Sequence, residues 1–139
     1  MSLFNVFNIS GSGMSAQSMR LNTTASNIAN ADSVSSSIDQ AYRARYPVFA
    51  AAMQNAADGQ QTNVGVDVLG VVESSKPLNV EYAPEHPMAD KNGNIYKPNV
   101  NVIEEMTNMI SASRSYQTNI QIAESAKSML TKTLQLGQR

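Results

Sequence analysis

The stretch NVIEEMTNMISASRSYQTNIQIAESAKSMLTKTLQLGQ, residues 101–138, decides the fold because its apolar residues alternate four and three positions apart without a proline. This spacing is typical of a coiled-coil helix. Asn101 followed by Glu104 predicts a helix cap, and Gly137 predicts the end of the helix. A helix of about 36 residues would be roughly 54 Å long. Its predicted stripe contains Val102, Met106, Met109, Ser113, Tyr116, Ile120, Ala123, Lys127, Leu130 and Leu134.

A helix of that length needs an apolar partner, since most helical stability comes from packing. The five prolines all lie between residues 47 and 98, so a second long helix is predicted only at the N-terminus. Gly11 and Gly13 in that segment indicate either a bend or a close approach of two backbones. The large residues that recur there every seven positions are Phe7, Met14, Leu21 and Ile28.

The middle of the chain has strand patterns. AYRARYPVFA (41–50) and PLNVEYAP (77–84) alternate apolar and polar residues, and TNVGVDVLGVVES (62–74) is rich in valine. Asn92-Gly93 predicts a hairpin turn. The polar stretches 33–37 and 54–63 are predicted to be loops.

The predicted fold is therefore mainly α. Long N- and C-terminal helices pair as an antiparallel coiled coil, with a small β-rich, extended insertion in the middle. The expected boundaries are 1–30 for the N-terminal helix of the coiled-coil core, 31–98 for the β-rich and loop insertion, and 99–139 for the C-terminal helix of the core.

Two asparagines stand at the end of the first helix, in ASNIANADSVSSS (25–37). Asn30 is predicted to end the helix in the left-handed conformation. Asn27, one turn earlier, is placed to bond a neighbouring backbone and fix the register, as a single polar residue does in a coiled coil. The alternative is that both amides only cap and solvate the helix end.

The composition argues against nucleic-acid binding and against most kinds of catalytic site. The net charge of −1 is no footprint for nucleic acid, and the absence of cysteine excludes disulfides and thiolate catalysis. The lone histidine, His86, is interpreted as a loop residue because no nucleophile motif accompanies it. The sequence predicts no enzyme, no cofactor, no metal site, no small-molecule substrate and no nucleic-acid partner.

Two segments resemble a known family. SAQSMRLNTTASNIANADS (15–33), with its A-x-N-I-A-N-A core, resembles the N-terminal signature of the flagellar axial proteins: the rod, hook and hook-associated subunits. Residues 101–138 resemble the C-terminal half of that signature. Within this family the chain is most similar to the C-type proximal rod proteins of the basal body, through ASNIANADSVSS, AYRARYPVF, VEYAPEHPMAD and PNVNVIEEM.

The resemblance implies a structural subunit of the bacterial flagellar basal-body proximal rod. Such subunits pass through the flagellar type III export apparatus without a cleaved signal peptide and assemble in the periplasm into a tubular drive shaft. The implied partners are other proximal and distal rod proteins, the inner-membrane ring and export-gate junction proteins, and further copies of the chain. The rod transmits torque and surrounds the export channel.

The assembly interface is predicted from the helix stripes and the two amides. The methionines in these stripes are interpreted as seam residues, with a promiscuous binding groove as the alternative. A second class of function, a non-enzymatic helical adaptor or export chaperone, remains open. We expect the isolated chain to have poorly ordered termini. The predicted interface residues are Phe7, Met14, Leu21, Asn27, Ile28, Asn30, Met106, Met109, Tyr116, Ile120, Leu130 and Leu134.

Overall fold

The structure is a computed structural model that describes residues 3–52 and 64–137. Two long helices stand at the two ends of the chain and four short strands lie between them, which confirms the predicted mainly α class with a β-rich middle. The elements are α1 (Leu3–Ala29), β1 (Arg45–Ala51), β2 (Val66–Glu73), β3 (Asn79–Tyr82), β4 (Asn94–Lys97) and α2 (Val102–Gly137).

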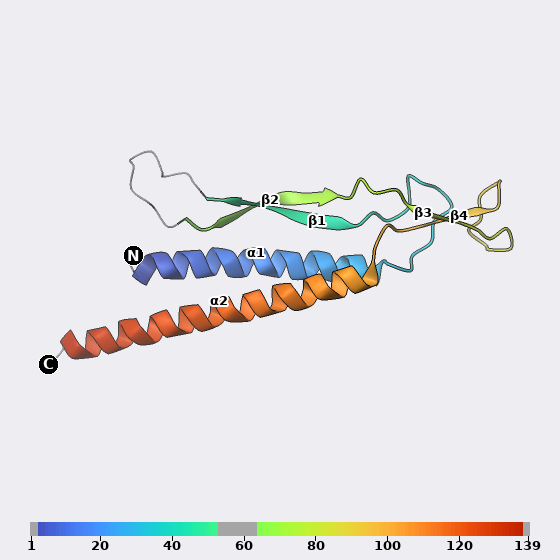
Figure 1. Cartoon of the computed structure of the whole chain (residues 1–139). Coiled ribbons are helices and arrows are strands. Elements are labelled where there is room, and N and C mark those ends of the chain that lie inside the picture. The colour runs from blue at the N-terminus through green and yellow to red at the C-terminus, as the bar shows by residue number, and fades with distance from the viewer. Residues whose placement is uncertain (1–2, 53–63, 138–139) are drawn as a thin grey trace.

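The elements form an elongated, layered molecule (Figure 1). Helix α1 lies in the middle, with α2 along one side and the β1–β2 hairpin along the other. The small β3–β4 sheet extends past the end of the helix pair where α1 stops and α2 starts. Helix α1 therefore carries the contacts that hold both outer layers.

Named contacts fix how the two helices lie against each other. The Asn27 amide donates to Glu105 Oε2 at 3.0 Å. The Arg20 guanidinium donates to Asn108 Oδ1 at 2.9 Å, on the next turn of α2. Further along, Gly13 faces the Asn119 side chain. In these three contacts the residue numbers fall along α1 while they rise along α2, so the chain runs in opposite directions in the two helices. The contacts are spread from Asn27 to Gly13, so the helices lie against each other over much of the length of α1.

The packed face of α2 is shifted by one residue from part of the predicted stripe. Its buried residues are Glu105, Ala112 and Ala126, which lie at multiples of seven positions from one another. Met106, predicted in the stripe, points outward and is 55% exposed. Close helix approach selects small side chains, and small residues give no hydrophobic signal in a sequence.

Glycine in α1 has two different environments. A Cβ atom added to Gly13 would stand 2.8 Å from Asn119 Nδ2, which is closer than carbon and nitrogen atoms pack. The same atom added to Gly11 would meet nothing within 4 Å. The close approach predicted for these glycines is therefore present at Gly13 alone.

The helix ends follow the predicted caps in part. The Asn101 side chain accepts from the backbone N–H groups of Ile103 and Glu104, so it caps α2 as predicted. Asn30 follows α1 and its amide donates to the Ser26 carbonyl at 2.8 Å. The left-handed conformation predicted for Asn30 is wrong, because no described residue other than glycine has a positive φ. The hydrogen bond from the Asn30 side chain back to the Ser26 carbonyl ends the helix without a left-handed residue.

The β1–β2 hairpin is antiparallel, with Arg45 opposite Glu73 and Ala51 opposite Val66. A bulge interrupts the register between Val48 and Phe49. The strand predicted over 41–50 begins later, at Arg45.

The β3–β4 sheet pairs Asn79 with Lys97 and Tyr82 with Asn94. The predicted Asn92-Gly93 turn exists, and Gly93 has a φ of +80°. It belongs to a longer loop between the strands rather than to a two-residue hairpin, which corrects the prediction. The reason is local: Asp90 accepts from the backbone N–H groups of Asn92 and Asn94 and holds the turn by itself.

Of the two predicted loops, 33–37 is irregular but anchored. Ser35 exchanges both backbone hydrogen bonds with Tyr96 at 3.0 Å. The prediction for 54–63 falls entirely on residues outside the described ranges. His86 lies in the loop after β3, where its Nδ1 accepts from the Met88 N–H.

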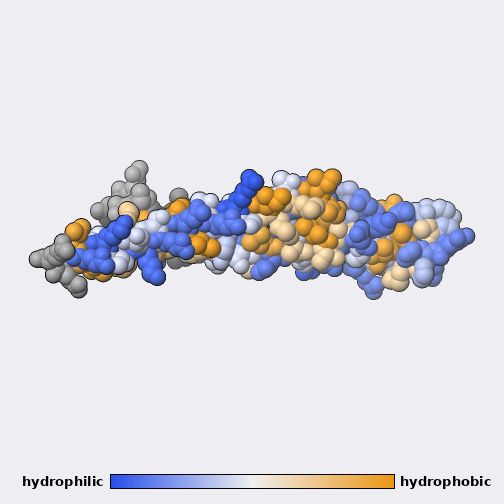
Figure 2. Space-filling model, turned by 90° about the horizontal axis from the view of Figure 1, so that it is seen from below, coloured by the Kyte–Doolittle hydropathy of each residue, from blue (hydrophilic) through white to orange (hydrophobic). Residues whose placement is uncertain are grey.

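Apolar surface remains uncovered on the outside. Figure 2, seen from the α2 side, shows an orange patch over the half of α2 nearer the β3–β4 end. Exposed apolar side chains there are Val102, Ile103, Met106 and Ile110. Within the described ranges, neither helix is long and apolar enough to span a bilayer.

Candidate assembly interface

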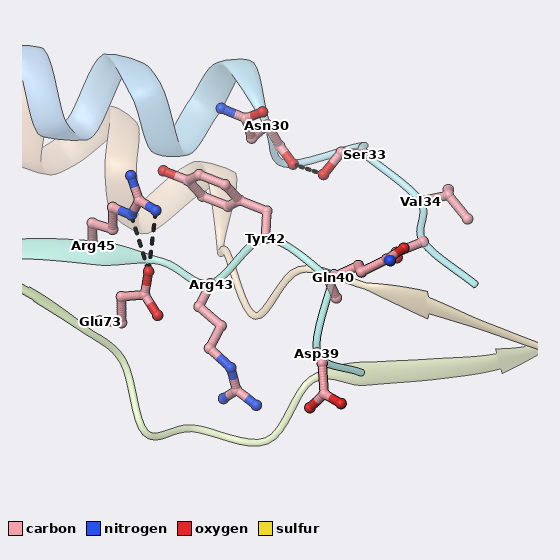
Figure 3. Close-up of a pocket in the computed structure, with 11 residues that line it drawn as sticks. Asn30, Ser33, Val34, Asp39, Gln40, Tyr42, Arg43, Arg45 and Glu73 are labelled. Carbon is pink, nitrogen blue, oxygen red and sulfur yellow. Dashed lines mark hydrogen bonds and ion pairs between the residues drawn. The ribbon is translucent and has the colours of Figure 1, made fainter. Parts of the chain in front are cut away.

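The chain leaving α1 folds back to reach β1 and encloses an open, mainly polar pocket of about 480 Å³ (Figure 3). One wall is the turn after α1, in which the Ser33 hydroxyl donates to the Asn30 carbonyl at 2.8 Å. The opposite wall is the ion pair of Arg45 and Glu73, at 3.1 Å. The pocket is lined by Asn30, Ser33, Val34, Ser35, Asp39, Gln40, Ala41, Tyr42, Arg43, Arg45 and Glu73.

The pocket shows no reaction chemistry. Its carboxylates are Asp39 and Glu73, and its remaining groups are amides, hydroxyls and guanidinium groups. Among the described residues no three His, Cys, Asp or Glu side chains come together as metal ligands. A catalytic site needs a nucleophile or base held by a second group; the carboxylate that is held here, Glu73, is engaged in its ion pair with Arg45.

Behind the pocket wall lies the central junction, where α1, α2 and β1 meet at Asn27. Asn27 is 0% exposed. Its Oδ1 accepts from the Arg45 N–H and from the Tyr42 hydroxyl, each at 2.9 Å. Its Nδ2 donates to the Arg45 carbonyl at 2.9 Å and to Glu105 Oε2 at 3.0 Å. All four hydrogen-bonding positions of the amide are used.

The geometry at Asn27 imitates a strand. One amide group bonds both the N–H and the C=O of Arg45, which is what a neighbouring peptide would do at the edge of a sheet. Helix α1 thereby supplies the missing partner to the first residue of β1. The prediction that Asn27 bonds a neighbouring backbone is confirmed, and that backbone belongs to its own chain.

Glu105 forms the α2 side of the junction and was missed as a site residue by the sequence. It is 1% exposed, and its second oxygen, Oε1, has no hydrogen-bond partner among the described residues. Burial, followed by the negative charges of Glu105 and Glu104, raises the pKa of Tyr46. In the sequence Glu104 and Glu105 are two adjacent acidic residues in the first turn of the helix, and only the position of Glu105 on the seam distinguishes them.

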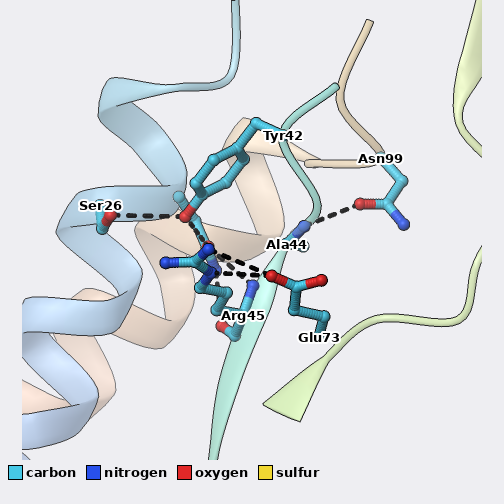
Figure 4. A network of polar contacts seen from close by, with 7 residues as sticks. Ser26, Tyr42, Ala44, Arg45, Glu73 and Asn99 are labelled. Carbon is cyan, nitrogen blue, oxygen red and sulfur yellow. Dashed lines mark hydrogen bonds and ion pairs between the residues drawn. The ribbon is translucent and has the colours of Figure 1, made fainter. Parts of the chain in front are cut away.

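Around the buried amide lies a second layer of polar contacts (Figure 4). The Tyr42 hydroxyl is 3.4 Å from the Ser26 hydroxyl, and the Arg45 guanidinium stands 5.6 Å from the centre of the Tyr42 ring. Ala44 is buried, and its N–H donates to Asn99 Oδ1 at 2.8 Å. These contacts tie β1 to the segment that leads into α2.

The hairpin has one further anchor on α1. Ser12 Oγ donates to the Ile9 carbonyl and accepts from the Val66 N–H at 3.1 Å. A Cβ on Gly65 would stand 2.5 Å from this oxygen, so the strand entry fits closely over α1. Asn27 and Ser12 therefore hold the two ends of the hairpin.

The predicted interface residues divide into three groups. Asn27 is buried in the junction. Met106 and Leu134 are exposed, so they belong to no seam within the chain. The others are half-buried and lie on α1, directly after it or on α2: Phe7, Met14, Leu21, Ile28, Asn30, Met109, Tyr116, Ile120 and Leu130.

The start of α1 leaves a small apolar hollow of about 290 Å³ against α2. Val6 stands on the α1 side, and Ile122 and Met129 on the α2 side are exposed. Beyond this point every described residue from 131 to 137 is exposed. The last two turns of α2 therefore have no partner among the described residues.

Two family profiles match this chain. Residues 7–35 match the family described as "Flagella basal body rod protein", and residues 91–136 match "Flagellar basal body rod FlgEFG protein C-terminal". These segments contain most of α1 and α2 and both sides of the Asn27–Glu105 contact.

Relatives match over the whole length. The flagellar basal-body rod protein FlgC of Salmonella typhimurium is 52% identical over 138 residues, which is 99% of this chain and 100% of the relative. The FlgC protein of Yersinia enterocolitica is 49% identical over the same shares. That of Buchnera aphidicola subsp. Baizongia pistaciae is 39% identical, again over 99% of this chain and 100% of the relative.

Proposed function

The chain belongs to the family of flagellar basal-body rod proteins, and we propose that it assembles through its two long helices into the proximal part of the rod. The family is structural rather than enzymatic, and the chain is a structural component of the rod. In the proposal, α1 and α2 act as an antiparallel coiled coil that packs against neighbouring subunits. The assembled tube transmits torque and surrounds the export channel.

One observation carries the proposal: α2 has two apolar faces and the chain covers only one of them. The seam with α1 uses small residues such as Ala112 and Ala126. The outward side keeps Ile103, Met106 and Ile110 exposed near the start of α2. Large apolar side chains in water favour burial against another surface. A subunit of a tube would supply that surface.

The exposed apolar residues continue at the other end of the helix. Met129, Leu134 and Leu136 are all exposed where α2 has no partner among the described residues. The predicted interface residues Met106 and Leu134 lie in these two regions, so they are proposed to contact neighbouring subunits rather than α1.

The proposal also states how the chain is exported and which proteins it contacts in the rod. We infer export through the flagellar type III apparatus without a cleaved signal peptide, and assembly in the periplasm. The proposed partners are proximal and distal rod proteins, the junction of the inner-membrane ring and export gate, and further copies of the chain. The charge-poor α1, with Arg20 as its only charged residue, suits packing among several helices because few charges lose their water.

The test is deletion of this chain in its own cell, followed by purification of basal bodies. The proposal predicts loss of motility, an inner-membrane ring that still forms, and recovery of the tagged full chain in purified basal bodies. Recovery only in the cytosol, with normal basal bodies in the deletion strain, would instead support an adaptor or export chaperone and overturn the proposal.

A further inference from the structure

The loop between β3 and β4 contains the only Asn-Gly pair of the sequence, Asn92-Gly93, at the end of the molecule beyond the helix pair (Figure 1). Each of the other asparagines is followed by a residue that has a Cβ atom. The backbone nitrogen that follows an asparagine can attack its side-chain amide, and glycine hinders this attack least because it has no Cβ. By sequence, Asn92 is therefore the asparagine of this chain that loses ammonia most easily.

The side-chain amide of Asn92 lies on the surface. It makes no hydrogen bond to a residue of the described ranges; only the backbone N–H of Asn92 is engaged, by Asp90 Oδ1 at 2.8 Å. By contrast, the side-chain amides of Asn27 and Asn99 are bonded to the backbone of distant residues. Nothing comparable keeps the Asn92 side chain from rotating toward the next peptide nitrogen.

The fold requires glycine at position 93. Gly93 has a φ of +80°, in the left-handed region that other residues rarely adopt. A Cβ atom added there would stand 2.9 Å from Tyr82 Cε2 and 3.1 Å from Pro84 Cβ. The loop therefore needs, directly after Asn92, the residue that makes the Asn92 amide most reactive.

The folded turn restrains the attacking nitrogen. Asp90, Lys91, Asn92 and Gly93 form a turn that the Gly93 N–H closes by donating to the Asp90 carbonyl at 3.0 Å. The turn is type I, because no described residue other than glycine has a positive φ. To attack the Asn92 amide, the Gly93 nitrogen must give up this hydrogen bond and turn toward Asn92 Cγ.

Asp90 holds the turn from both sides of Gly93. Its Oδ1 accepts from the Asn92 N–H at 2.8 Å and from the Asn94 N–H at 2.9 Å. Its own N–H donates to the Asn94 carbonyl at 2.9 Å, and its Oδ2 accepts from the Tyr96 hydroxyl at 3.2 Å. The loop has to open locally before the attack, and opening it breaks these bonds.

We propose that Asn92 is a deamidation site, at which water converts the side-chain amide to a carboxyl group, and that the turn held by Asp90 slows this reaction in the folded chain. Asp90 is a positioning residue, because it acts on the Gly93 nitrogen through the backbone of the turn. The site does not depend on the rod function, so the failure of one proposal leaves the other standing.

The reaction needs only water and a solvent base. The Gly93 N–H loses its proton to the base, the nitrogen forms a bond to Asn92 Cγ, and the C–N bond of the side-chain amide breaks. The amide nitrogen takes up a proton and leaves as ammonia. Water then opens the cyclic imide at one of its two carbonyls, which leaves aspartate or isoaspartate at position 92. Isoaspartate adds a carbon atom to the main chain, so the bonds between Asp90 and Asn94 no longer fit the turn.

Peptide mapping by mass spectrometry follows the reaction in the purified full-length chain, kept in mildly alkaline buffer with and without guanidinium chloride. In the denaturant, Asn92 is expected to be the first asparagine converted. In the folded chain its conversion should be at least about tenfold slower, because the loop must open first. Earlier conversion of another asparagine in the denaturant, or equal rates at Asn92 in both buffers, would overturn the proposal.

Variants of the folded chain test the part played by Asp90. Asp90→Ala should raise the rate at Asn92 about tenfold, because the hydrogen bonds to a charged acceptor are lost. Asp90→Asn should raise it by less, since a neutral amide oxygen accepts the same bonds more weakly. Glu85→Ala, an exposed change in the same loop, is the matched control and should leave the rate unchanged.

Circular dichroism checks that each variant keeps its helices, so that a faster reaction reports opening of the loop and not unfolding of the chain. Equal rates in Asp90→Ala and the natural chain, or in Asp90→Ala and Asp90→Asn, would show that the side-chain oxygen of Asp90 does not protect Asn92. The comparison of the natural chain with and without denaturant needs no variant, and it tests the site even if Asp90→Ala does not fold.

Discussion

The two ends of α2 differ in which kinds of side chain they bury and which they expose. Near its start, at the central junction, polar groups are buried and paired within the chain: Asn27 uses all four of its hydrogen-bonding positions. Near its end, Leu134 and Leu136 are apolar and exposed. In an ordinary globular protein the buried groups would be apolar and the exposed ones polar.

The difference separates contacts that shape the subunit from surfaces left for neighbours. Directional hydrogen bonds at Asn27 fix how the hairpin and α2 sit on α1, because each bond requires one geometry. The exposed apolar side chains fix nothing within the chain. The junction is therefore expected to be ordered in the isolated subunit, and the far end of α2 to become ordered on assembly.

The largest effect is expected for Asn27→Ala, which removes the whole junction. It leaves the Arg45 N–H and C=O, the Tyr42 hydroxyl and Glu105 without their partner, and should destabilise the chain by about 3 kcal/mol. Urea unfolding followed by tyrosine fluorescence measures the change. Export should continue while rod assembly weakens, which a motility assay reports.

Asn22→Ala is the matched control on the exposed side of α1. It should change stability by less than about 0.5 kcal/mol. Equal effects of the two variants, or normal motility with Asn27→Ala, would mean that the junction does not hold the subunit together.

Glu105→Ala should have the next largest effect, about 2 kcal/mol, because it removes one partner of Asn27 and leaves a cavity on the seam. Its neighbour Glu104 is exposed, and Glu104→Ala should cost only about 0.5 kcal/mol through the helix dipole. The two unfolding curves are compared under one set of conditions. Identical midpoints would place Glu105 outside the junction.

Replacing Gly11 and Gly13 of α1 by alanine tests how closely the two helices approach each other at these positions. Gly11→Ala meets no neighbour and should raise stability by up to about 1 kcal/mol. Gly13→Ala brings the same gain but pushes Asn119 aside, so it should be less stable than Gly11→Ala by about 1 kcal/mol. Thermal unfolding by circular dichroism distinguishes them, and a Gly13→Ala variant as stable as Gly11→Ala would show that the helices do not approach here.

The smallest effect is expected at the exposed β3–β4 loop. Hydrogen bonds from the backbone, that of Asn94 first, lower the pKa of Asp90. A carboxylate with a lowered pKa stabilises the fold above its unfolded pKa of about 3.9, and this contribution is lost as pH falls through the lower, folded value. The Gly93 amide signal should therefore shift on acidification below about pH 4. In Asp90→Asn that shift should be absent; an unchanged shift would assign it to another group.

Much of the fold could be predicted from the sequence. Proline positions and heptad spacing gave helices over 1–30 and 99–139, and the structure has them at Leu3–Ala29 and Val102–Gly137. The strand ends were less accurate because β1 starts where Asn27 supplies a hydrogen-bond partner, at Arg45, and that contact joins residues distant in sequence.

The site could be predicted only in part. Asn27 stood out as an amide on an apolar stripe. Glu105 did not, since it neighbours Glu104 and only its burial reveals its role. Hydropathy also assigned Met106 to the stripe in place of Glu105, because a sequence does not say whether a large apolar residue faces its own chain or a neighbour.

If neighbouring subunits cover the end of α2 in the rod, hydrogen exchange will differ between the isolated chain and the assembled rod. Amide protection is measured by mass spectrometry in the dilute isolated chain and in purified basal bodies. Residues 105–126 are expected to be protected in both, and residues 131–137 are expected to exchange rapidly in the isolated chain and to be protected in the basal body. Equal, strong protection of 131–137 in the dilute isolated chain would contradict this expectation.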